Sequence, residues 1–318
     1  MKKIFLFAAA AMVSLSSCVQ TEEVYTGALH ELGFNSAVTR GIIQEDEDMV
    51  YPISVGAILD NTDPSQTNFT PYFENAEFVY DEGNQWWKGN PAKYWPTSGD
   101  MHFIGLCPYP VKASVKYTYK ADGTYEKVTF GTIDNNLMDQ HDVLYSDLYS
   151  VEAPQTGKQP LLFHHAYAQL NVTFKKTASD AAVVVNSVSV EDVNLSGILE
   201  VTPVIGGTST AVWTIGLPVS RFFLDDDATG VEDGVLDAAL HHENLFSPKP
   251  VVVIPGAQTE IVIEYTIDGY HHTYTHKLTG DWKMGYKYTY NYTINVSEIL
   301  FDCTVEGWIP EEGGNITI

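Results

Sequence analysis

The stretch YKYTYNYTINV, residues 286–296, alternates apolar and polar residues along its whole length. Successive side chains of a β-strand point to opposite faces, so this alternation gathers the apolar residues on one face. That face would carry Tyr286, Tyr288, Tyr290, Tyr292, Ile294 and Val296. The stretch therefore predicts a half-buried strand with one face in a core and the other in water.

Similar patterns recur outward from this stretch. YPISVGAIL (51–59) alternates, and PVVVIPG (250–256) is a continuous apolar run, as in a strand buried on both faces. Residues 260–278 form two alternating runs around an Asp-Gly pair, which is a hairpin signal. No segment of twelve or more residues has helical periodicity, and LMDQHDVLYSDLYS (137–150) is the best candidate for a short helix. The sequence therefore predicts an all-β fold with little helix.

Composition limits the functions that this chain can have. Its 318 residues suggest two domains, and its 12% aromatic content indicates a foldable chain. A net charge of −24 argues against nucleic acid as a partner, since phosphates require Lys and Arg. The loop-like patch EAPQTGKQP (152–160) predicts a boundary between β-domains at 41–157 and 158–318.

The first residues read as an export signal. Lys2 and Lys3 precede an apolar run over 4–13, which matches a secretory signal and is too short to span a bilayer. LSSC (15–18) resembles the bacterial lipobox, and this resemblance implies that residues 1–17 are removed and Cys18 is lipidated. Acyl chains on Cys18 would form a firm membrane anchor. The two other cysteines, Cys107 and Cys303, are expected to be buried free thiols, with a disulfide as the alternative.

Several stretches of the sequence are candidates for chemical sites. The histidine pairs offer too few converging ligands for zinc, so we expect no metal there. The acidic loop at 225–234 begins like a calcium loop but has Leu236 where an EF-hand needs Glu, and calcium stays open. Aromatic residues in NQWWKGNPAKYWP (84–96) could stack on a sugar, although packing is the favoured interpretation. No catalytic or phosphate-binding motif occurs, so the sequence predicts neither enzyme nor cofactor.

Six stretches in order carry a resemblance to a known family. They are TRG (39–41), YWPTSGDMHFIGLCPYP (94–110), LLFHHAYAQLNVTF (161–174), VVVIPG (251–256) and LTGDWKMGYKYTYNYTINV (278–296), followed by VEGWIP (305–310). With the lipobox, they resemble the fimbrillin family of Bacteroidales, the lipoprotein pilins of type V pili. The resemblance covers most of the chain.

The resemblance implies a fold and a maturation route. The fold would be two transthyretin-like β-sandwich domains in tandem. An arginine-specific protease would cut between Arg40 and Gly41 and remove the arm at 18–40, together with its first strand. The vacated groove would accept a strand from a neighbouring subunit, and residues 301–318 would act as the donor strand. The alternative is that 301–308 is the last strand of its own domain and 311–318 is a tail.

The expected function is a structural pilin of a cell-surface fimbria that serves adhesion. It would reach the outer membrane as a palmitate-bearing lipoprotein and then assemble with other pilin subunits. Alternatives are a tip adhesin or anchor subunit of a pilus, or a monomeric surface lipoprotein that binds glycans. The ligand would be a host or bacterial surface.

Overall fold

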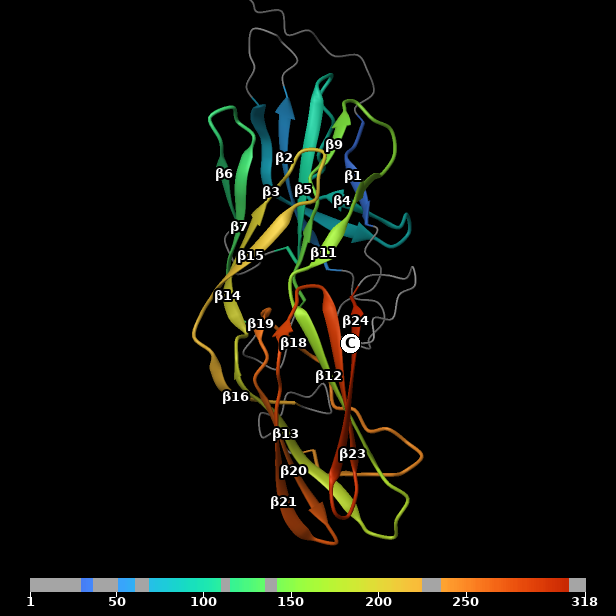
Figure 1. The fold of residues 1–318 in the computed structure, drawn as a ribbon. Coiled ribbons are helices and arrows are strands. Elements are labelled where there is room, and N and C mark those ends of the chain that lie inside the picture. The colour runs from blue at the N-terminus through green and yellow to red at the C-terminus, as the bar shows by residue number, and fades with distance from the viewer. Residues whose placement is uncertain are drawn as a thin grey trace, which may run out of the picture.

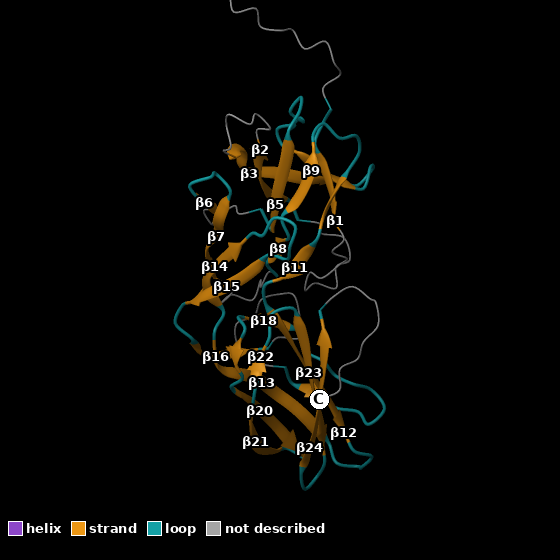
Figure 2. Ribbon diagram, turned by 45° about the horizontal axis from the view of Figure 1, so that its top comes forward, coloured by secondary structure: helices purple, strands orange, loops and turns teal. Residues whose placement is uncertain are grey.

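The computed structural model describes residues 30–36, 51–60, 69–109, 115–134, 142–224 and 236–308. These residues form strands and loops without any helix, as Figure 2 shows. The predicted all-β fold is thus confirmed. The predicted short helix at 137–150 is wrong over its second half. There, β8 (Leu144–Ser146) and β9 (Tyr149–Glu152) both pair with β5 (Asp100–Cys107), because Leu144 and Tyr145 are buried on opposite faces of a sheet.

The strands form two lobes arranged end to end (Figure 1). The first lobe contains a nine-stranded sheet whose ends, β10 (Gln159–Leu161) and β11 (Phe163–His165), are separated by only one residue in the chain. The sheet therefore curls until its ends meet, and it encloses a core that we call the upper core. In order between β10 and β11 lie β1 (Gly33–Ser36), β4 (Trp86–Gly89), β3 (Phe69–Asp81), β2 (Ile53–Asp60), β5 and β8, while β9 pairs with β5.

A smaller sheet covers the first lobe. Its order is β15 (Thr210–Ile215), β14 (Ser196–Thr202), β7 (Tyr125–Asp134) and β6 (Val115–Tyr119). Ile104 and Leu106 of β5 face Leu199 and Val201 of β14 in a second cluster, the middle core. The middle core also contains Trp308, near the end of the described chain, so it joins the two lobes.

The second lobe is a sandwich of two sheets around one core, the lower core. One sheet has the order β18 (Val251–Val253), β12 (Ala168–Lys176), β23 (Tyr286–Ile294) and β24 (Ile299–Gly307). The other has the order β16 (Val219–Phe223), β13 (Val183–Val193), β20 (Glu260–Ile267) and β21 (Tyr270–Lys277), with β17 (Ala238–Ala239) beside β13. A short ladder pairs β19 (Gly256–Ala257) with β22 (Asp281–Trp282).

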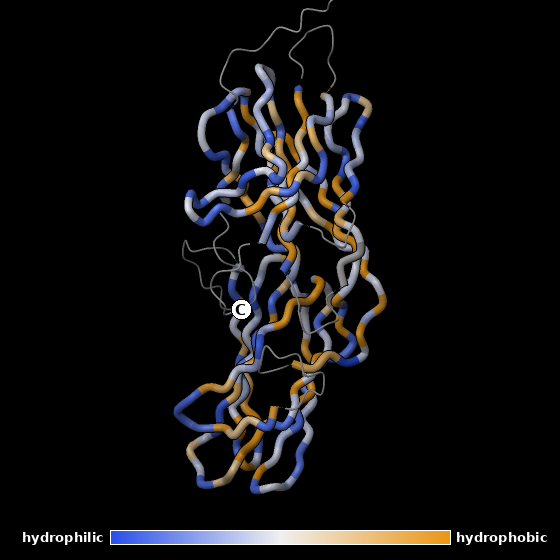
Figure 3. Tube along the Cα trace, turned by 180° about the vertical axis from the view of Figure 1, so that it is seen from behind, coloured by the Kyte–Doolittle hydropathy of each residue, from blue (hydrophilic) through white to orange (hydrophobic). Residues whose placement is uncertain are grey.

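Strand predictions from alternation are confirmed in this lobe. In β23, Tyr288, Tyr290, Tyr292 and Ile294 are buried, whereas Val296 lies beyond the strand and is exposed. The predicted hairpin is β20–β21, turned by the Asp-Gly pair at 268–269, both with positive φ. The continuous run at 250–256 contains β18, which is buried on both faces between the lower and middle cores. Figure 3 shows apolar segments along the strands of both lobes and hydrophilic stretches in the loops.

The predicted boundary between residues 157 and 158 does not follow the sheets. β10 and β11 lie beyond it yet complete the nine-stranded sheet. The chain then crosses to the second lobe, returns with the β14–β15 hairpin, which pairs with β7, and crosses again at β16. Leu199 and Val201 explain the return, because they are fully buried in the middle core.

The cysteines lie in different cores. Both are free, and Cys107 is buried in the upper core as predicted. The prediction of a buried thiol is wrong for Cys303, which is only partly buried against the lower core. Burial raises the pKa of Cys107, and it raises the pKa of Cys303 to about 11, so both thiols stay protonated and inert near neutral pH. Among the described residues, no helix is long and apolar enough to cross a membrane.

Candidate functional site

The candidate sites for processing and calcium fall outside the described residues. These are Cys18, Arg40, Gly41 and the acidic loop at 225–234. Within the described ranges, no group of three or more His, Cys, Asp or Glu residues could hold a metal ion. What the structure does place is strand β1, which belongs to the arm predicted at 18–40.

Strand β1 occupies an interior position of the nine-stranded sheet. It runs parallel to β10, with Phe34 opposite Gln159, and antiparallel to β4, with Gly33 opposite Lys88. The Leu32 N–H also donates to the Lys93 carbonyl at 2.7 Å. β1 therefore fills a slot between two strands that do not pair with each other.

The inner face of β1 is an apolar anchor. Leu32 and Phe34 are fully buried in the upper core. The Phe34 ring makes edge contacts with Phe78 and Phe103, with ring centroids 5.0 and 5.1 Å apart respectively. Full burial of such a side chain contributes about 1.5–3 kcal/mol, so two anchors hold a strand of only four residues.

The outer face of β1 lies under a tryptophan ring. A Cβ atom added to Gly33 would lie 1.9 Å from Cζ3 and 2.0 Å from Cε3 of Trp86. Lys88 lies on the same ring, with its Nζ 5.2 Å from the ring centroid, and forms an ion pair with Asp81 at 2.5 Å. Trp86 thus covers the one residue of β1 that has no side chain.

The turn before β4 is organised by Asp81. Its carboxylate accepts hydrogen bonds from the Asn84 backbone N–H at 3.2 Å and from the Asn84 side-chain amide at 2.9 Å. Its carbonyl accepts from Gln85, a residue with φ of 55°. Hydrogen bonds from Lys88 and then Asn84 lower the pKa of Asp81 to about 2, so the carboxylate stays charged in mild acid.

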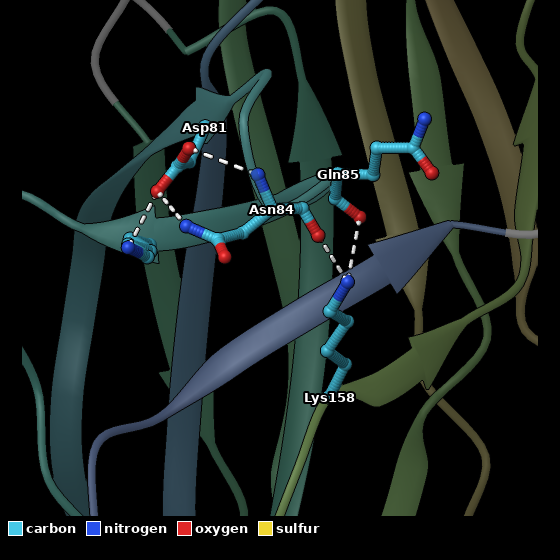
Figure 4. Close-up of polar contacts among 5 residues, drawn as sticks. Asp81, Asn84, Gln85 and Lys158 are labelled. Carbon is cyan, nitrogen blue, oxygen red and sulfur yellow. Dashed lines mark hydrogen bonds and ion pairs between the residues drawn. The ribbon is translucent and has the colours of Figure 1, made fainter.

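Lys158 links this turn to the opposite side of β1. Its ammonium donates to the carbonyl oxygens of Asn84 and Gln85, the latter at 3.3 Å. Lys158 directly precedes β10 and the turn directly precedes β4, so the contact passes over the strand between them, as Figure 4 shows. We call Lys158 and the turn at 81–85 the clasp. It closes the outer side of the slot that holds β1.

Only part of the stretch predicted as a donor strand, residues 301–318, lies among the described residues. Residues 301–307 belong to β24, which pairs with β23 along its whole length. Trp308 is 5% exposed, and its ring stacks on His165 with centroids 3.9 Å apart. Its backbone N–H donates to the Gly285 carbonyl at 2.5 Å. Residues 309–318 lie outside the described part of the chain. The alternative interpretation of 301–308 as a strand of its own domain thus describes its place in this structure.

The three tryptophans of the aromatic group at 86–95 are used for packing. Trp95 is buried against Phe103, and Trp87 packs on Tyr80 while its indole N–H donates to the Tyr51 carbonyl. Trp86 covers Gly33 as described above. A sugar would need exposed flat rings, and these three rings are occupied by protein contacts.

Comparison with known protein families identifies the family of this chain. The Fimbrillin-like family matches residues 43–308. The chain belongs to the fimbrillin-like family. No curated protein matches it significantly.

Two solved structures share the fimbrillin-like fold of this chain. A fimbrial protein from Bacteroides vulgatus is 17% identical with a TM-score of 0.53, and the alignment covers 87% of this chain and 99% of that one. A candidate cell adhesion protein from Bacteroides uniformis is 16% identical with a TM-score of 0.51 and the same coverage. Family membership supports a pilin-type structural subunit at a cell-surface fimbrium, and not an enzyme.

Sequence reasoning missed the residues that seat β1. Leu32 and Phe34 sit at alternate positions, but two apolar residues around a glycine are too weak a signal for a strand. The sequence around Trp86 is also compatible with a sugar-binding surface, and the sequence around Lys158 predicts a linker. Their shared role depends on which strands become neighbours, and the local pattern does not encode that.

Proposed function

We propose that this chain is a structural pilin whose slot is opened by removal of β1 and refilled by a strand from a neighbouring subunit. The observation that supports this is the position of β1, a short arm strand seated between two strands that do not pair with each other. An empty slot would leave the ladder groups of β10 and β4 unpaired and the upper core open. Such a groove is a template for an added strand.

Maturation would begin with lipidation of Cys18 and continue with cleavage between Arg40 and Gly41 by an arginine-specific protease. The chain has two arginines, Arg40 and Arg221. Arg221 lies in β16, opposite Glu191 of β13, and its guanidinium donates to that carboxylate at 2.8 Å. A protease needs an extended unpaired substrate, so a paired strand protects Arg221 and cleavage is directed to Arg40.

The sharpest test treats the purified full chain with an arginine-specific protease. We expect one cut, after Arg40, followed by laddering on gels as subunits join. Arg40→Lys should block both events, because the enzyme does not cut after lysine. Arg221→Lys is the matched control and should behave like the unmodified chain.

Two results would contradict the proposal. One is a first cut at Arg221, and the other is normal fibre assembly by Arg40→Lys. N-terminal sequencing of the protein from intact cells separates the alternatives. A pilin begins at Gly41, whereas an anchor subunit or a surface lipoprotein begins at acylated Cys18.

A further inference from the structure

The glycine in β1 is required by space and not by backbone conformation. Gly33 is not among the residues with positive φ, so any L-residue could adopt its backbone geometry. The obstacle is the Trp86 ring, which a Cβ at position 33 would approach to 1.9 Å. Real Cβ atoms do not approach other heavy atoms closer than about 3.0 Å. Any larger residue at this position must therefore move the ring.

The Trp86 ring is held in place by the side chain of Lys88, which lies over it. Lys88 lies 5.2 Å from the Trp86 ring centroid, and the ion pair with Asp81 fixes Lys88. Asp81 also organises the turn that Lys158 binds from across β1. Moving the ring would therefore disturb the clasp as well.

We propose that Trp86 is a specificity-determining residue of the slot, which selects strands with a glycine between two large apolar residues. This inference rests on the proposed function and adds the identity of the incoming strand. Leu32 and Phe34 define the apolar positions, since both are fully buried. Gly33 defines the small position between them. The sequence that fits the slot is thus apolar–Gly–apolar.

The C-terminal sequence of this chain does not meet that requirement. IPEEGGNITI (309–318) offers Ile316 and Ile318 as apolar anchors, but this register puts Thr317 under the Trp86 ring. Registers that put Gly313 or Gly314 there place a glycine, glutamate or asparagine at the buried positions. This C-terminal stretch therefore lacks the motif, and the slot requires a donor segment that carries apolar–Gly–apolar.

The first experiment measures, in the intact chain, how much a side chain at position 33 weakens the pairing of β1 by colliding with Trp86. Hydrogen exchange of the Leu32 amide is compared among the wild type, Gly33→Val, Trp86→Ala and the double variant. We expect Gly33→Val to accelerate exchange at least tenfold, and the double variant to exchange within threefold of Trp86→Ala. Gly256→Val is the matched control, because Gly256 also lies in a strand but has no atom within 4 Å of an added Cβ. Equal protection in the wild type and Gly33→Val would overturn the inference.

The second experiment measures which donor peptide enters the slot fastest. A single engineered protease site between residues 37 and 48 of the full chain is cut, which leaves β1 held without a covalent link. Three labelled peptides then compete for the slot: residues 28–38, the same peptide with Gly33→Val, and residues 309–318. We expect the first to enter at least tenfold faster than the others, and all three to enter alike when the acceptor carries Trp86→Ala.

The outcomes separate this inference from the proposed function. Equal entry of all three peptides into the wild-type acceptor overturns the selectivity of Trp86 while supporting strand replacement. Entry of none of them into either acceptor overturns strand replacement, and the intact-chain experiment then decides the role of Trp86.

Discussion

Lys158 shows how one exposed side chain can control a strand that it does not belong to. It joins the two flanks of β1 through the carbonyls of Asn84 and Gln85. An exposed hydrogen bond of this kind contributes about 0.5–1.5 kcal/mol. Its sequence context, EAPQTGKQP, predicted only a linker, which agrees with the rule that loops on a rigid scaffold often carry function.

We expect Lys158→Met to accelerate hydrogen exchange of the β1 amides roughly threefold to tenfold, because the clasp no longer closes the slot. The β5 amides should not change. Lys175→Met is the matched control, since Lys175 is an exposed strand lysine of the second lobe. Unchanged exchange in Lys158→Met would mean that the clasp does not retain β1.

His102 makes the first lobe sensitive to pH. It is buried in β5, and its Nδ1 lies 2.6 Å from Ser150 Oγ. Burial lowers the pKa of His102, although Asp60 and Asp100 partly oppose this shift. The unfolded chain therefore binds more protons below about pH 6.5, and stability falls as pH decreases through this range.

Urea unfolding between pH 7 and pH 5 measures this effect. We expect the free energy of unfolding to fall by up to about 1.4 kcal/mol per pH unit from His102, and His102→Asn to remove that part of the slope. A smaller slope should remain, because burial also lowers the pKa of His276. His271→Asn, at an exposed position of β21, is the matched control for the removal of one imidazole.

At the scale of single elements, β24 is anchored by Trp308, the residue that follows it. Trp308 lies in the middle core, between His165 of β11 and Lys287 of β23, whose Nζ lies 5.7 Å from the indole ring centroid. His165 is fixed in turn by the buried Asp142 at 2.5 Å. Trp308 therefore anchors the end of the described chain in the middle core.

We expect Trp308→Ala to lower the free energy of unfolding by about 3–5 kcal/mol, as for other buried aromatic truncations. Trp308→Phe should lose less than half of that, because it keeps the stack on His165. Leu300→Ala is the control, since Leu300 lies in β24, the strand that Trp308 follows, but is 50% exposed. This change should alter stability by less than about 1 kcal/mol. A loss in Trp308→Ala no larger than that of Leu300→Ala would contradict the role of Trp308 as an anchor. Chemical denaturation followed by far-UV circular dichroism gives all three values.

How far the elements could be predicted depends on how local their signals are. β23, β18 and the β20–β21 hairpin were predictable, because each has a local signal in consecutive residues. These signals are alternation, a continuous apolar run and an Asp-Gly pair. β1 was not predictable from its own pattern, since Gly33 reads as a breaker until Trp86 is known to cover it. The β14–β15 hairpin alternates clearly, but alternation identifies a buried face and not the strand that pairs with it.

At the scale of the whole molecule, the return of this hairpin ties the lobes together. Leu199 and Val201 complete the middle core, the Trp213 indole N–H donates to the Ala166 carbonyl at 2.7 Å, and the Ser209 N–H donates to the Asp147 carboxylate at 2.7 Å. The first lobe is thus built from two separate parts of the chain.

This interlock predicts which fragment folds. Residues 1–157 lack β10, β11 and the hairpin, so we expect this fragment to show no cooperative thermal transition. A matched fragment joins residues 1–166 to 194–217 through a flexible linker of about 20 residues, which restores all of these strands. We expect it to unfold in one transition, because the β6–β7 pair regains its partner β14 and the nine-stranded sheet can close. Differential scanning calorimetry distinguishes the two. If residues 1–157 unfold cooperatively on their own, the first lobe is a contiguous domain after all, and the hairpin only decorates it.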